Sequence, residues 1–174
     1  MRKRFKVFTL LFVFAAVLII AVSASAQSTT FSNENVDYTF ELPNPTWKMV
    51  SEPSKIKPNV EYVFGDRNSG YLEVRKLSVK ADSTMADIIG DEETKLRFVQ
   101  GYVAGREEQF AGNLRGTVFN YEYIRSGRTM SGRMYFLRAD SATIYTIRFT
   151  GYKEKLLSIR NQTDSIARTF QVRK

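Results

Sequence analysis

The sequence contains neither cysteine nor histidine. Without imidazole, the chain lacks the side chain whose free pKa best suits general acid–base catalysis near neutral pH. Serine–histidine and cysteine–histidine nucleophilic pairs are excluded for the same reason. Sites for zinc, copper or iron lose their preferred ligands, and no disulfide can form. An enzyme made from this chain would depend on carboxylate, lysine, tyrosine or serine–lysine chemistry.

The carboxylates do not form a recognisable catalytic pair. Glu107 and Glu108 are adjacent in an expected strand, so their side chains point to opposite faces. The acidic cluster at residues 91–93 is typical of a solvated first helical turn, where negative charge suits the helix dipole. We therefore predict no catalytic residue, no metal site and no cofactor. Carboxylate chemistry is the alternative that stays open.

A long hydrophobic run occurs at the N-terminus. Residues 2–6 are basic apart from Phe5, the segment 7–22 is apolar and uncharged, and small residues follow at 24–26. This order is typical of a secretory signal peptide. The apolar run is shorter than the roughly 20 residues that a spanning helix requires, which favours cleavage between Ala26 and Gln27 over an uncleaved anchor. We predict an exported protein, periplasmic or secreted, with no stable membrane span after cleavage.

The charge of the mature chain argues against nucleic acid as a partner. The full sequence has 26 basic and 18 acidic side chains. Four basic side chains lie in the predicted signal peptide, which leaves 22 against 18 and a net charge of +4. Such a charge is ordinary for a soluble domain. We divide the chain into a signal peptide at 1–26, a polar leader at 27–35 and a single domain at 36–174, expected to be monomeric.

Strand and helix patterns alternate along this domain. Alternating apolar and polar residues, bounded by turn residues, predict several strands. Thr84 and Asp87 have the spacing of a capping box and begin a helix that is kinked or divided near Gly90. A second amphipathic helix is predicted at 152–168. Residues 65–70 are predicted to form a long hairpin turn. The strands are predicted at 36–42, 47–50, 60–64, 71–79, 102–110, 116–125, 129–139, 142–150 and 170–173.

These elements predict an α+β fold in which an antiparallel β-sheet is sandwiched by helices. The short links between the later strands favour an antiparallel meander, and the two amphipathic helices are available to cover the sheet. A cystatin-like or lipocalin-like curved sheet wrapped over a helix is the alternative. That alternative would enclose a pocket under the sheet and make the protein a carrier of a small apolar ligand.

Tyrosine and arginine side chains are concentrated on three neighbouring strands. These residue types dominate binding hot spots, so a shared face would dock an acidic or aromatic partner. The competing interpretation buries the aromatic rings under the helices, with arginines reaching water at the strand ends. The candidate contact surface consists of Tyr121, Tyr123, Arg125, Arg133, Tyr135 and Tyr145.

The order of elements and three short segments resemble a known group. A first strand runs into Pro43 and then Trp47, a late strand contains residues 145–149, and the last helix closes at residues 166–170. In these features the chain resembles the PsbP-like family, named for an extrinsic subunit of photosystem II. The resemblance implies an α-β-α sandwich and non-enzymatic work through contacts with a protein or an envelope component. It does not imply photosynthetic function, and no functional residue of the family matches a position here.

Overall fold

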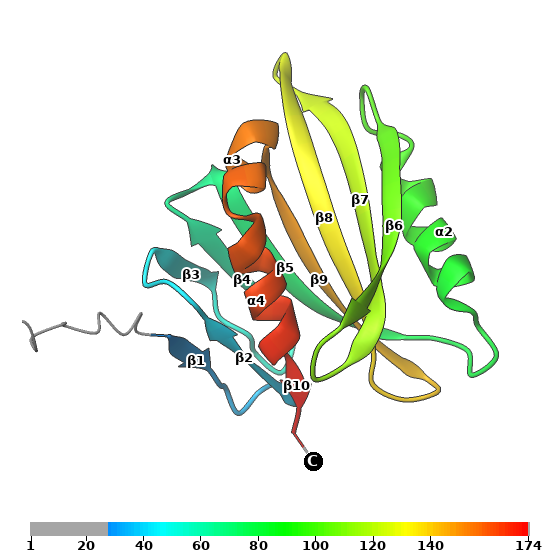
Figure 1. Ribbon diagram of the computed structural model, residues 1–174. Coiled ribbons are helices and arrows are strands. Elements are labelled where there is room, and N and C mark those ends of the chain that lie inside the picture. The colour runs from blue at the N-terminus through cyan, green and yellow to red at the C-terminus, as the bar shows by residue number, and fades with distance from the viewer. Residues whose placement is uncertain (1–27, 174) are drawn as a thin grey trace, which may run out of the picture.

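The computed structural model describes residues 28–173 and is built around a large antiparallel sheet (Figure 1). Its seven strands lie in the order β3-β4-β5-β9-β8-β7-β6. The predicted cleavage between Ala26 and Gln27 falls outside the described residues. Within them, no helix has the length and hydropathy needed to cross a membrane. The strands are β3 Trp47–Ser51, β4 Val60–Phe64, β5 Asp66–Ser78, β6 Val103–Ala111, β7 Arg115–Arg125, β8 Arg128–Arg138 and β9 Thr143–Tyr152.

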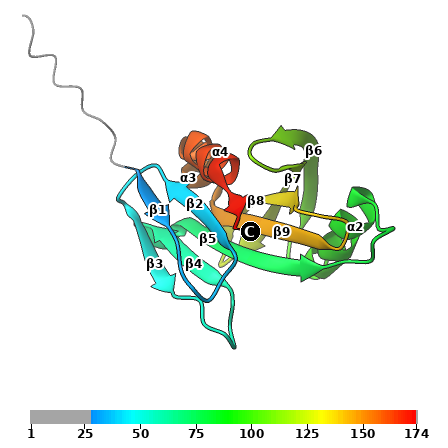
Figure 2. The same cartoon turned by 90° about the horizontal axis from the view of Figure 1, so that it is seen from below.

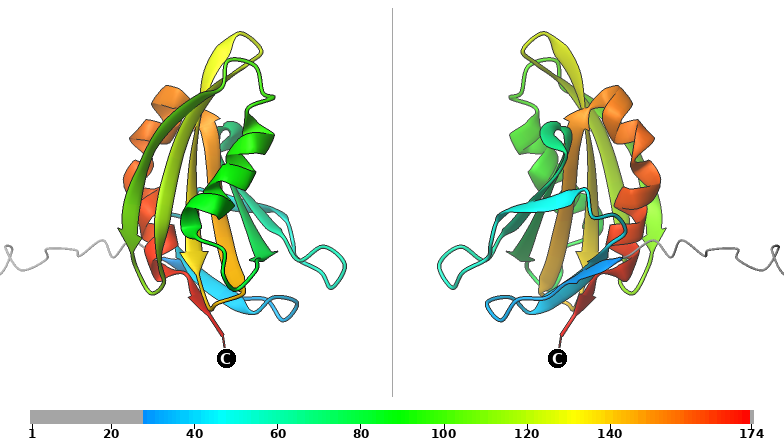
Figure 3. Two further views of the ribbon diagram at one scale, coloured as in Figure 1. Left: turned by 90° about the vertical axis from the view of Figure 1, so that its right-hand side faces the viewer. Right: turned by 90° about the vertical axis from the view of Figure 1, so that its left-hand side faces the viewer.

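Helices cover both faces of this sheet (Figure 3). Helix α2, Met85–Leu96, lies on one face, which we call the α2 face. Helices α3, Lys153–Ser158, and α4, Arg160–Thr169, lie on the other, the α4 face. The predicted α+β sandwich is confirmed. The cystatin-like or lipocalin-like alternative is wrong, because the sheet stays open between β3 and β6 and has helices on both sides.

Side chains of the central strands point alternately to the two faces of the sheet, so these strands contribute to a hydrophobic core on each face. On β8, Tyr135 and Leu137 belong to the cluster on the α4 face, whereas Met134 and Phe136 belong to the cluster on the α2 face. This is the expected behaviour of a strand with period-two side chains and both faces covered. Both faces of the sheet therefore carry a helix and a hydrophobic core.

The two ends of the domain meet on the α4 face. A second, three-stranded sheet contains β1 Thr29–Phe31, β2 Tyr38–Leu42 and β10 Gln171–Val172, with β2 in the middle. The ring of Phe170 lies 5.2 Å from that of Tyr38 and 6.4 Å from that of Phe40. Figure 2 shows the C-terminal segment beside this N-terminal sheet. The predicted polar leader at 27–35 thus contains a strand, and its Phe31 is buried in the core.

Local signals decide where the helices begin and end. The capping box of α2 is confirmed, because the Thr84 side chain accepts from the Asp87 amide while Asp87 accepts from the Thr84 amide. Gly90 is tolerated inside α2, which is one continuous helix. The predicted C-terminal helix is instead divided into α3 and α4 at Ile159, whose φ of −106° leaves the helical region.

The predicted turn at 65–70 is mostly strand. The reversal is completed at Gly65, which has a φ of +73°, and β5 begins at Asp66. The Asp66 carboxylate accepts hydrogen bonds from the amides of Asn68 and Ser69 at 2.7 and 2.9 Å. These bonds satisfy donors at the start of the strand, before β5 pairs with β9 at Tyr71.

Candidate functional site

The predicted contact surface is divided between the two faces of the sheet. In the observed register Tyr121 is opposite Gly132 and points to the α2 face, whereas Arg133 and Tyr135 point to the α4 face. Tyr121, Tyr135 and Tyr145 are at most 2% exposed, and Arg133 is 6% exposed. The prediction of one exposed face shared by these residues is therefore wrong.

A tight turn between β7 and β8 is the physical reason. The strands run to Arg125 and from Arg128, which are paired, so only Ser126 and Gly127 form the turn. Both turn residues have positive φ values, 51° and 71°, as in the two-residue hairpin turns that match strand twist. The predicted three-residue link shifts the register by one residue, and such a shift moves every side chain of one strand to the other face.

Arg133 and Tyr135 of the α4 face belong to one hydrogen-bond network with α4. The Arg133 guanidinium donates to Tyr135 Oη at 2.7 Å, to Asp164 Oδ1 at 2.8 Å and to Asn120 Oδ1 at 2.8 Å. Tyr135 also donates to Asp164 Oδ1. These bonds join β7 and β8 to α4, so the network holds the helix on the sheet.

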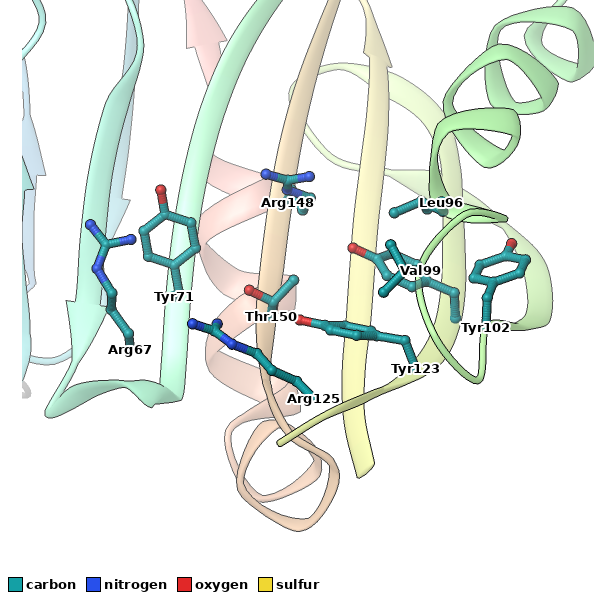
Figure 4. A pocket seen from close by; sticks show the side chains of 10 residues that line it. Arg67, Tyr71, Leu96, Val99, Tyr102, Tyr123, Arg125, Arg148 and Thr150 are labelled. Atoms are coloured by element: carbon teal, nitrogen blue, oxygen red, sulfur yellow. The ribbon is translucent and has the colours of Figure 1, made fainter. Parts of the chain in front are cut away.

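The α2 face, by contrast, contains an open pocket of about 250 Å³ (Figure 4). It lies beside the C-terminal end of α2, over the parts of β5, β7 and β9 that this helix leaves uncovered. Tyr123 and Arg125, from the predicted surface, both line it. In Figure 4 the guanidinium of Arg125 reaches from the end of β7 toward Tyr71. The polar lining is completed by Arg67, Tyr102, Tyr121, Arg148 and Thr150.

Guanidinium groups outnumber carboxylates around this pocket. Glu73 is 5% exposed and is shared by Arg148, at 2.5 Å, and Arg75, at 2.8 Å. Arg67 pairs with Glu61 at 3.3 Å, and Arg125 makes no ion pair with any residue that the structure describes. Three guanidinium groups line the pocket, and Arg125 is the one among them that has no ion pair within the described residues.

The tyrosines of the pocket are neutral over the physiological pH range. Burial and the nearby carboxylate of Glu61 raise the pKa of Tyr71 to about 12. Burial and the negative charge of Glu93 raise the pKa of Tyr102 to about 12. Burial also raises the pKa of Tyr121 and of Tyr123. The charge of the pocket therefore comes from the arginines, and the phenols contribute aromatic surface and neutral hydroxyl groups.

Stacked rings on β7 form the floor of the pocket. The ring centroids of Tyr121 and Tyr123 are 6.1 Å apart, with 26° between their planes. The Tyr121 ring lies directly over Gly132, where a Cβ atom would approach the ring carbon Cζ to 2.0 Å. On the far wall, the Arg67 guanidinium lies 4.6 Å from the centroid of the Tyr71 ring. Gly132 on the neighbouring strand β8 therefore leaves the space that the Tyr121 ring occupies against the sheet.

This arrangement can bind an anion but offers no acid–base pair. The buried carboxylate, Glu73, is occupied by two guanidinium groups. Among residues 28–173, no group of three potential ligands is placed to hold a metal ion. Aromatic side chains fill the α4 face, and the pocket on the α2 face combines three arginines with four tyrosines, Leu96 and Val99.

The surface predicted from the sequence contains three of the ten residues that line the pocket. Arg67 and Tyr71 were assigned to a turn and to a separate strand, and Tyr102 and Thr150 were given no role. One signal was available: Arg148 is a charged residue within the otherwise buried strand run 145–149. A charge in such a run is costly unless it is paired, so its presence indicates a partner such as Glu73 nearby.

Comparisons with known proteins identify the fold. No protein-family model and no curated protein matches the sequence. Several solved structures are similar at a probability of 1.00. The Ran-binding protein Mog1p of Saccharomyces cerevisiae has a TM-score of 0.59 and 12% identity, with 85% of this chain and 96% of that chain covered.

Two bacterial structures extend this similarity. Cyanobacterial PsbP from Synechocystis has a TM-score of 0.56 and 14% identity, over 84% of this chain and 93% of that one. LpqN, described as involved in cell envelope biogenesis of Mycobacterium tuberculosis, has a TM-score of 0.55 and 12% identity, over 85% and 91%. The chain therefore has the PsbP/Mog1 fold, as the resemblance implied.

Proposed function

We propose that this protein is an exported, non-enzymatic binding module that acts through contact with another protein or with a component of the cell envelope. Proteins with the same fold support the binding role, since Mog1p is described as Ran-binding and LpqN as involved in envelope biogenesis. The signal-peptide pattern at 1–26 supports export. The absence of histidine and cysteine supports a role without catalysis.

The observation that carries this proposal is the open pocket on the α2 face. It brings three arginines and four tyrosines from β5, β7, β9 and the segment after α2 to one place. These residue types contribute most to binding energy at interfaces, because they combine large aromatic area with directed hydrogen bonds. We therefore assign the binding site to this pocket and no longer to the divided surface predicted from the sequence.

Retention of envelope components on the immobilised protein tests this assignment. Arg125→Ala removes the guanidinium that makes no ion pair, and Arg115→Ala removes one charge from the exposed opposite end of the same strand. We expect Arg125→Ala to lower retention of a specific component by about tenfold or more, the effect of a lost charge-assisted hydrogen bond. Arg115→Ala is expected to retain as much as the wild type. Equal retention by all three proteins would remove the pocket from the binding site.

A further inference from the structure

The pocket on the α2 face continues into an exposed apolar rim. The rim consists of Phe98 and Val99, which are 88% and 36% exposed. They lie in the segment between α2 and β6, which the hydrogen bond from the Ile124 amide to Gln100 O at 2.8 Å joins to β7. Large apolar side chains gathered at one exposed site are typical of an interaction surface.

The rim adjoins the pocket. Val99 lines the pocket and follows Phe98 directly. A partner that reached the guanidinium groups would therefore also contact the apolar rim. An isolated small anion would use the pocket and leave the rim in water.

The chemistry of the occupant follows from the charge. Three guanidinium groups line a cavity of about 250 Å³, and Arg125 among them has no ion pair within the described residues; the cavity admits one side chain and is too small for a folded element. A carboxylate suits this cavity, since guanidinium groups bind carboxylates through paired hydrogen bonds and neutral phenols donate further ones. The rim next to it suits a leucine-sized or phenylalanine-sized side chain.

We infer that the pocket and its rim bind an acidic segment of a partner protein, with one carboxylate side chain between Arg125 and Arg148 and a neighbouring apolar side chain on the Phe98 rim. This inference rests on the proposed function and names the chemistry of the partner. An anionic lipid surface fits less well, because the part of the rim that is most exposed is one aromatic side chain and the charges are recessed in a cavity.

Fluorescence anisotropy with defined probes tests the inference. The main probe is a short fluorescein-labelled peptide of glutamate, leucine and glycine. In one matched peptide glutamine replaces glutamate, and in the other serine replaces leucine. Vesicles of phosphatidylglycerol form a separate arm. We expect the main peptide to bind, and both matched peptides to bind at least about tenfold more weakly, which corresponds to about 1.4 kcal/mol.

Variants of the protein locate the bound peptide. Arg125→Ala is expected to weaken binding by about tenfold and Phe98→Ala by about fivefold, whereas Arg115→Ala has no effect. Equal weakening by Arg125→Ala and Arg115→Ala would indicate general charge attraction and overturn the inference. Binding to vesicles without binding to the peptide would also overturn it.

The two proposals fail in different ways. If the acidic peptide does not bind but retention of an envelope component still depends on Arg125, the inference about the partner's chemistry is wrong and the proposed function stands. If neither depends on Arg125, the pocket is not the binding site.

Discussion

Removal of Asp164 tests whether the buried network on the α4 face holds α4 in place. Asp164→Ala leaves the Arg133 side chain, which is 7% exposed, without its nearest carboxylate. Breaking a buried ion pair by removing one partner costs about 3–5 kcal/mol, because an uncompensated charge stays out of water. Asn120 and Tyr135 remain within hydrogen-bond distance of Arg133. We therefore expect a loss of about 3 kcal/mol in the free energy of unfolding, at the lower end of that range.

Arg133→Met provides the matched control. It removes the buried charge itself and leaves Asp164, whose side chain is 21% exposed and can be hydrated. The replacement is of similar length and apolar, so the expected loss is smaller, about 1 kcal/mol. The predicted asymmetry between the two partners follows directly from their different exposure.

Urea unfolding followed by tryptophan fluorescence measures both variants. Trp47 is the single tryptophan, is 4% exposed and donates from Nε1 to Gln162 Oε1 of α4 at 3.1 Å. Its emission therefore reports on the contact between α4 and the sheet. The urea concentrations at half-unfolding are compared between proteins whose free energy of unfolding has the same slope against urea concentration. Under that condition a shift of the midpoint measures a change in stability. The reasoning is refuted if Asp164→Ala costs less than Arg133→Met.

Three further predictions concern the floor of the pocket, the start of α2 and the charge of the site. Gly132→Ala places a Cβ atom 2.0 Å from the Tyr121 ring, so it should lower the free energy of unfolding by about 1–3 kcal/mol and weaken peptide binding; an unchanged urea midpoint would contradict the stacked floor. The hydrogen bonds from Thr84 lower the pKa of Asp87 from its ordinary 3.8, so the charged carboxylate stabilises the fold above about pH 4 and this contribution is lost as the pH falls below that value. Thr84→Ala should weaken this acid dependence, because the side-chain hydrogen bond is lost and the backbone one remains, and should cost about 1 kcal/mol at neutral pH, measured by thermal unfolding; a wild-type acid profile in the variant would exclude the role of the Thr84 side chain. Peptide binding should be constant from about pH 6 to about pH 9, since burial and nearby carboxylates raise the pKa of Tyr71 and Tyr102 to about 12; a change within that range would indicate another titrating group.

Elements set by local chemistry could be predicted from the sequence. Thr84 and Asp87 predicted the start of α2, because a capping box depends on residues three apart and on nothing distant. The strands from residue 102 onward were predicted to within a few residues for a similar reason, since each has a run of alternating or continuous apolar residues. These patterns indicate which residues are extended and which are helical. The α+β class follows from the order of the strands and helices along the chain.

The candidate site depended on a register that the sequence pattern leaves undetermined. A serine in the left-handed region, as at Ser126, is uncommon. The pattern therefore gave no reason to prefer a two-residue turn over a three-residue link. That single residue decided whether Tyr121 and Tyr135 share a face. The interpretation that buries the aromatic rings under the helices was the correct one for Tyr121, Tyr135 and Tyr145.

The pairing of β2 with β10 has a consequence for when this chain can fold. Tyr38 and Phe40 find their partner Phe170 only after almost the whole polypeptide is available. The aromatic cluster of the three-stranded sheet is therefore completed last during synthesis, because its final ring comes from the C-terminal end of the chain. Removal of the last five residues would leave the seven-stranded sheet with all its strands and deprive the first strands of their closing partner.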